Sequence, residues 1–187
     1  MRKDGFIEAL RDYEQACSKD ELRFVDSMRD FVLSTDKPFC RSTEQGHITA
    51  SAWILNTDRT HALLCHHRKL DMWIQLGGHM EPEQDDSVFA GATREAYEES
   101  GLGELEALAP EIFDIDIHRI PAHGAEPAHL HYDVRYLFAA KANNAVQLTR
   151  ESKDLAWVKL DEVHTLSQEQ SLLRMAEKSL RYIDRSR

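Results

Sequence analysis

The sequence predicts a mixed β-sheet covered by helices, which is an α+β fold or an α/β/α sandwich. Three observations support this class: helical periodicity at both ends, strand-like alternation between them, and one well-bounded helix in the middle of the strands. The 187 residues suffice for one domain of ordinary size with extra elements. We expect an N-terminal helical extension over residues 1–45, packed on the core, and a main domain with a C-terminal helix over residues 46–187.

The elements are expected in the following order along the chain. Apolar residues recur at three- to four-residue steps between residues 4 and 34, which predicts two helices that end before Pro38. Strands are expected at 47–55, 61–65, 72–76, 111–118, 130–138 and 154–158. The segments 111–118 and 130–138 alternate strictly between apolar and polar residues, as strands with one buried face do. The segment 168–184 carries an apolar stripe at helical spacing and closes the chain.

The central helix is bounded by capping residues. Asp85, Asp86 and Ser87 are suitable N-cap residues, and Gly101 suits the position after the helix end. A helix from about Ser87 to Ser100 is therefore expected. On its helical wheel, three carboxylates border the apolar stripe instead of facing open water: Glu95, Glu98 and Glu99.

Three like charges on neighbouring helical positions repel one another, and partial burial raises that cost. Arg94 can pair with Glu98 at a spacing of four residues. A cluster of hard oxygen ligands at the border of a helix is what Mg²⁺ or Mn²⁺ would stabilise. The alternative from the residues alone is a solvated acidic face.

Composition and charge restrict the partners of the chain. The formal net charge of −10 opposes non-specific binding to nucleic acid and to anionic membranes. A phosphorylated small molecule could bind if a metal cation bridged the two negative partners. The three cysteines are scattered, the N-terminus has no apolar signal-peptide core, and no run reaches about 18 apolar residues. We expect a cytoplasmic protein, and the N-terminal helices offer a surface for a homodimer.

Histidines and a basic stretch form two further candidate sites. His118, His129 and His131 lie around one loop, and such a group could bind Zn²⁺. The alternative is a polar strand face satisfied by nearby aspartates, or a border of the substrate pocket. Arg68, in the stretch His66–Lys69, could contact phosphate or belong to a solvated turn.

The segment GGHMEPEQDDSVFAGATREAYEESGL resembles the Nudix box. Its second half matches throughout, as Arg94, Glu95, Ala96, Tyr97, Glu98, Glu99, Ser100, Gly101 and Leu102. The first half departs from the pattern, because it is two residues longer between Gly78 and Arg94. Asp86, or Asp85, then stands where the family has an upstream glutamate, in a supporting position.

The resemblance implies a Nudix-like α/β/α sandwich that hydrolyses a nucleoside diphosphate linked to another moiety. It implies Mg²⁺, or Mn²⁺ as a substitute, held by Glu95, Glu98 and Glu99, with Glu95 as a ligand or a base. Arg94 would orient the carboxylates, and Glu151 or, with lower rank, Glu126 would supply a further acid. The expected substrate contacts are Gly77, Gly78, His79 and Arg68. The alternatives are a Nudix-like module that binds a nucleotide without turnover, and a zinc hydrolase that uses His118, His129 and His131.

Overall fold

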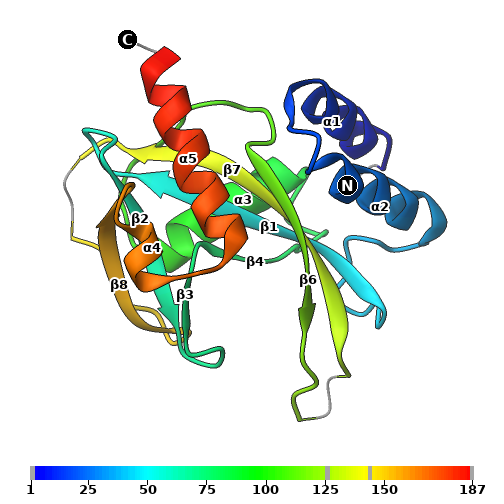
Figure 1. The fold of residues 1–187 in the computed structure, drawn as a ribbon. Coiled ribbons are helices and arrows are strands. Elements are labelled where there is room, and N and C mark those ends of the chain that lie inside the picture. Colours follow the sequence, from blue (N-terminus) through cyan, green and yellow to red (C-terminus); the bar gives the residue numbers. More distant parts are fainter. Residues whose placement is uncertain (1–2, 125–126, 143–144, 186–187) are drawn as a thin grey trace. The chain divides into compact units, whose positions relative to one another are not determined.

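A computed structural model describes residues 3–124, 127–142 and 145–185 of the chain (Figure 1). Its helices are α1 (Lys3–Ala16), α2 (Leu22–Ser34), α3 (Val88–Ser100), α4 (Val163–Leu166) and α5 (Gln170–Arg185). Its strands are β1 (Gly46–Leu55), β2 (His61–His67), β3 (Met72–Ile74), β4 (Leu76–His79), β5 (Leu105–Ala107), β6 (Asp114–Ile120), β7 (His129–Ala140) and β8 (Ser152–Lys159). Glu126 lies outside the described residues.

The described strands form one eight-stranded sheet with the path β3-β2-β1-β7-β5, while β4 pairs with β1, β6 with β7, and β8 with β2. The fold class predicted from the sequence is therefore confirmed: helices combine with a sheet of strands that are distant in sequence. Among the described residues, no helix has both the length and the apolar character that crossing a membrane requires.

Two differences from the expected elements are informative. The expected strand 72–76 is two strands, and the second one extends beyond the expected end through Gly77 and Gly78 to His79. Strand β5 and helix α4 were not predicted, since three or four residues are too few to show a period.

The chain forms two compact units. The first contains residues 1–51, 78–93 and 109–136, and the second contains residues 52–77, 94–108 and 137–187. Strands β1, β4 and β7 and helix α3 each contribute to both units by continuity of the chain. The boundary between an extension and a main domain at residue 46 remains a prediction.

In the first unit, helices α1 and α2 lie side by side (Figure 1). Their apolar stripes are buried as the periodicity predicted. Phe31 of α2 stacks on Tyr132 of β7, with ring centroids 4.0 Å apart. The backbone of Ile48 in β1 donates a hydrogen bond of 2.7 Å to the carbonyl of Pro38, so the segment after α2 is also fixed.

In the second unit, β2 pairs with β8 over almost its whole length. The buried indole of Trp53 donates a hydrogen bond of 2.8 Å from Nε1 to Oγ of Ser179 on α5. This bond satisfies two polar groups that would otherwise be costly inside an apolar core. The amphipathic stripe of α5 therefore has a polar anchor as well as apolar contacts.

Candidate active site and a histidine cluster

Helix α3 begins and ends where its capping residues predict. Ser87 accepts a hydrogen bond of 3.1 Å at Oγ from the backbone of Ala90, which is the N-cap interaction. Gly101 follows the helix at φ 66°, a left-handed conformation that glycine adopts at little cost. Ala92 and Ala96 are fully buried on the inner face, and Tyr97 is 39% exposed on the other. The border between these faces carries the glutamates.

Arg94 engages two of the three glutamates. Its Nη1 lies 2.9 Å from Oε1 of Glu95 and 3.1 Å from Oε2 of Glu98. The side chain of Glu95 is 12% exposed and that of Glu98 is 59% exposed. Burial raises the pKa of Glu95, and Arg94 partly opposes this shift. The arginine thus orients a half-buried and an exposed carboxylate toward the same guanidinium.

Glu99 is held by the glycine pair of β4. Its Oε2 accepts a hydrogen bond of 2.8 Å from the backbone N–H of Gly77. Gly77 has φ 150°, a backbone conformation that residues other than glycine rarely adopt. Burial raises the pKa of Glu99 to about 7, the Gly77 N–H opposes this, and the carboxylates of Glu95 and Glu151 add to it. Burial and the neighbouring carboxylates therefore outweigh the hydrogen bond from Gly77 in setting the pKa of Glu99.

Glu151 lies just before β8, and its charge influences the glutamates of α3. Its carboxylate contributes to the raised pKa of both Glu95 and Glu99, so the two segments are close enough to interact. A register shift between His66 and His67 accompanies the pairing of β2 with the start of β8. Such a bulge bends a strand and re-aims its neighbours.

Arg68 holds the backbone around Glu151. Its guanidinium donates to the carbonyls of Arg150 and Ser152, at 3.1 and 2.9 Å, and its backbone N–H donates to the carbonyl of Glu151 at 2.7 Å. These contacts give Arg68 a role in positioning Glu151, in addition to the predicted contact with phosphate.

The two aspartates upstream of α3 differ in environment. Asp85 is buried, and its Oδ2 accepts a hydrogen bond of 2.7 Å from the backbone of Glu81. Asp86 is exposed. The carboxylate of Asp85 therefore closes the loop that contains the two extra residues, while Asp86 stays available to solvent.

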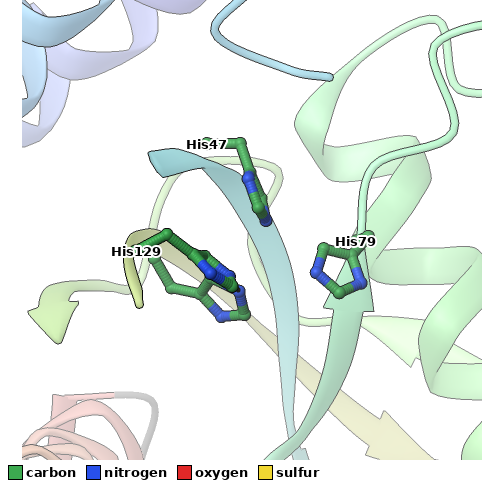
Figure 2. A group of neighbouring side chains, drawn as sticks. His47, His79 and His129 are labelled. Carbon is green, nitrogen blue, oxygen red and sulfur yellow. Dashed lines mark hydrogen bonds between the residues drawn. The ribbon is translucent and has the colours of Figure 1, made fainter. Parts of the chain in front are cut away.

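A second polar group lies in the first unit, and we call it the histidine cluster: His47, His79, His129 and His131. Figure 2 shows His47 from β1, His79 from β4 and His129 from β7 with their rings turned toward one another. One ligand atom from each of the four side chains lies within 4.8 Å of all the others. Within the described ranges this is the one set of three or more His, Cys, Asp or Glu that gathers so closely, and Glu95, Glu98 and Glu99 do not.

The histidine cluster differs from the trio expected from the sequence. His118 is not a member, because its Nδ1 faces Oδ2 of Asp116 at 3.4 Å. Burial and the neighbouring imidazoles of His79, His118 and His47 lower the pKa of His131 to about 2, so this ring is neutral in water near pH 7. Sequence reasoning missed His47 and assigned His79 to the substrate. The available signal was the polar alternation of His47, Thr49 and Ser51 in an otherwise apolar strand.

Beside the histidine cluster, a fully buried arginine joins three aspartates. Arg135 lies 2.7 Å from Asp133, 3.0 Å from Asp114 and 3.6 Å from Asp116. Asp133 also accepts hydrogen bonds from the hydroxyls of Thr49 and Ser51, at 2.9 and 2.7 Å. Although burial opposes it, Arg135 holds the pKa of Asp133 below its ordinary value. We call this the aspartate–arginine network.

Comparisons with known proteins identify the family. The model of the NUDIX domain matches residues 46–179. An Ap4A hydrolase of C. elegans in a binary complex has 17% identity and a TM-score of 0.59, over 73% of this chain and 97% of that one. A NUDIX-family hydrolase from Clostridium perfringens has 24% identity and a TM-score of 0.52, over 71% and 95%. The NUDIX domain of Shewanella oneidensis NrtR complexed with ADP ribose has 16% identity and a TM-score of 0.51, over 82% and 97%. A comparison with curated protein sequences found no match.

The family match covers more than half of the chain, and the chain belongs to the Nudix family. The resemblance inferred from the box and the Nudix-like fold are thereby confirmed.

Proposed function

We propose that the chain is a Mg²⁺-dependent hydrolase that cleaves the pyrophosphate bond of a nucleoside diphosphate linked to another moiety. The observation that supports this most directly is the complete half-box on α3, with the half-buried Glu99 bonded to Gly77 and its pKa raised. The donor set fits the ion, because carboxylate oxygens suit Mg²⁺ and the charge of three carboxylates exceeds that of Arg94, which pairs with Glu95 and Glu98. Mn²⁺ is the expected substitute.

In this proposal, Glu95, Glu98 and Glu99 hold the ion. When bound, the ion neutralises charge on the phosphate oxygens and acidifies the attacking water. Arg94 keeps the carboxylates of Glu95 and Glu98 together, through the contacts of 2.9 and 3.1 Å. Because positioning and electrostatics supply most of the rate in phosphoryl transfer, the chain itself needs no covalent step.

Glu151 or Glu95 accepts the proton of the attacking water. Glu151 lies at a segment end that Arg68 fixes, and its charge raises the pKa of both Glu95 and Glu99. Gly77 brings the backbone of β4 to Glu99, where a phosphate oxygen can approach the main chain, and Gly78 is proposed as a further substrate contact. Asp86 is proposed as a supporting acid upstream of the helix.

The proposed substrate is a small phosphorylated molecule, in keeping with structural neighbours that include an Ap4A hydrolase and a NUDIX domain complexed with ADP ribose. The net charge of −10 argues against non-specific binding of nucleic acid or of an anionic membrane. Three free cysteines, Cys17, Cys40 and Cys65, support a reducing compartment such as the cytoplasm. A homodimer is proposed through the N-terminal helices.

A nucleotide panel tests the function. The purified chain is stripped of metals, supplied with Mg²⁺ and assayed for phosphate-containing product on dinucleoside polyphosphates, nucleotide sugars and nucleoside triphosphates. We expect Glu98→Gln and Glu99→Gln to lower turnover at least about 100-fold, since even supporting groups around a metal contribute about 10- to 100-fold. Glu151→Gln should lower kcat more than it raises KM.

Glu106→Gln is the matched control, because Glu106 is an exposed glutamate on β5 of the same unit. It should retain the turnover of the natural chain. Full activity of both Glu98→Gln and Glu99→Gln would contradict the proposed mechanism. Tight nucleotide binding without turnover on any substrate would instead indicate a binding module, and activity restored by Zn²⁺ but not Mg²⁺ would indicate a zinc hydrolase.

A further inference from the structure

We propose that the histidine cluster binds one transition-metal ion, Zn²⁺ in the first instance, at a site separate in chemistry from the glutamates of α3. The four side chains come from β1, β4 and β7 of the first unit. An ion held by all of them would join three strands that are far apart in sequence. This inference does not depend on the proposed hydrolytic mechanism.

The spacing of the ring nitrogens matches a zinc site. Nε2 of His129 and Nε2 of His131 lie 3.2 Å apart. In a tetrahedral site with Zn–N bonds of about 2.0–2.1 Å, two ligand nitrogens are about 3.3 Å apart. All four ligand atoms lie within 4.8 Å of one another, so small rotations of the rings would complete the tetrahedron.

Backbone carbonyls hold the opposite edges of two rings. Nδ1 of His129 lies 3.0 Å from the carbonyl of Pro127, and Nδ1 of His47 lies 3.5 Å from the carbonyl of Thr43. A carbonyl can only accept, so these contacts place the proton on Nδ1 and leave Nε2 with its lone pair. Metal-binding histidines are oriented by such outer contacts in most protein sites.

The charge beside the cluster favours a cation. The aspartate–arginine network contains three carboxylates and one guanidinium, all from β6 and β7. It connects to the cluster through Asp116 and His118, whose ring centroid is 5.5 Å from that of His131. The network carries an excess of two negative charges, which a divalent ion beside it would balance.

The ligand type selects the metal and its role. Imidazole nitrogen suits Zn²⁺ and its neighbours among the transition metals, whereas Mg²⁺ prefers carboxylate oxygen and water. Four protein ligands fill a tetrahedral site, which is typical of structural zinc, while a catalytic zinc keeps one position open. The proposed ion therefore clamps the strands and differs from the zinc hydrolase considered above.

Cobalt provides the direct test, because tetrahedral Co²⁺ has intense visible absorption and occupies zinc sites. The metal-stripped chain is titrated with Co²⁺, and then with Zn²⁺ in competition with a coloured chelator. We expect one tetrahedral Co²⁺ per chain, displaced by Zn²⁺. We also expect a rise in Tm of at least about 5 °C with Zn²⁺ and little with Mg²⁺.

Half-buried members of the cluster are the variants of choice, because His47 is 2% exposed and its replacement could prevent folding. His79→Ala and His129→Ala should each weaken Zn²⁺ binding more than about 100-fold, since loss of an outer contact alone costs about 10- to 100-fold. His123→Ala, at an exposed histidine, is the control and should bind as the natural chain does.

Glu98→Gln should leave Zn²⁺ binding unchanged, which separates this site from the acidic one. The absence of a tetrahedral Co²⁺ spectrum in the natural chain would overturn the proposal. Undiminished binding in both His79→Ala and His129→Ala, with loss in His118→Ala, would overturn the assignment of the ligands.

Discussion

Glu99 is a carboxylate that the metal-free fold prefers to keep protonated. Its pKa of about 7 lies above the ordinary value of 4.5, first because of burial. Below pH 4.5 this carboxyl is protonated in both the folded and the unfolded chain, so it does not change the free energy of unfolding. Between pH 4.5 and about 7 it ionises first in the unfolded chain, so the stability present at low pH is lost as pH rises to the folded-state pKa.

We therefore expect Glu99→Gln to remove a pH-dependent loss of stability. Between pH 5 and pH 7.5, the metal-free natural chain should lose about 1–3 kcal/mol relative to the variant, after allowance for residual solvent contact. Denaturation by urea across this range measures the difference. Above pH 7, Mg²⁺ should restore the lost stability of the natural chain and leave the stability of the variant unchanged. Parallel pH profiles for the two proteins would contradict this expectation.

The acidic residues were predictable from the sequence, whereas the histidine cluster was not. Helical geometry alone places Glu95, Glu98 and Glu99 together, because all three lie within five residues. His47 and His131 are 84 positions apart, and they meet only because β1 and β7 are neighbours in the sheet. The pattern of residues within either strand does not show which strand is its neighbour.

At the scale of the element, the end of α3 depends on Gly101. A Cβ at this position would lie 2.6 Å from Cβ of Gln147, and φ is 66°. Gly101→Ala should therefore destabilise the chain by about 1–3 kcal/mol, through strain and crowding together. Urea denaturation measures the change.

Gly5→Ala is the matched control for that substitution. Gly5 lies in α1, and a Cβ there would meet nothing within 4 Å. Alanine also favours the helix by about 0.5–1 kcal/mol, so this variant should be neutral or more stable. A loss of stability in Gly5→Ala as large as that in Gly101→Ala would refute the local explanation.

Element boundaries show where local patterns end and tertiary structure begins. The capping residues predicted α3 to within one residue, because caps act through short-range hydrogen bonds. Strand β4 was not separated from β3, since its residues Gly77 and Gly78 have weak strand propensity. Pairing with β1 overrides that propensity.

At the scale of the whole molecule, the stability of the chain should depend on its N-terminal helices. Phe31 is 7% exposed and stacks on Tyr132. Phe31→Ala should cost about 3–5 kcal/mol, and removal of residues 1–45 should lower Tm further or prevent folding. Differential scanning calorimetry compares the two with the natural chain.

Leu33→Ala, two positions away in the same helix, is the control for Phe31→Ala. Leu33 is 62% exposed, and its replacement should change stability by less than about 0.5 kcal/mol. If residues 46–187 alone unfolded at the same temperature as the natural chain, residues 1–45 would be an independent appendage.

The sequence predicted the class of fold but not its pairing order. Alternation along 111–118 and 130–138 predicted two strands, and they do pair as β6 and β7. The expectation of one buried face was wrong, because Asp114, Asp133 and Arg135 on the polar face are buried in the aspartate–arginine network. The order β3-β2-β1-β7-β5 could not be inferred from residues alone, because period-two alternation specifies a face and not a neighbour.

The aspartate–arginine network also fixes the register in which β6 pairs with β7. Asp114 pairs with Arg135 and His118 with His131 across β6 and β7. A slip of one residue would turn Arg135 to the opposite face and set Asp114 against an apolar neighbour, with buried carboxylates left without their cation. A purely apolar strand pair would tolerate that slip at far lower cost. Misaligned forms of this hairpin are therefore excluded by electrostatics, before any ligand or metal is bound.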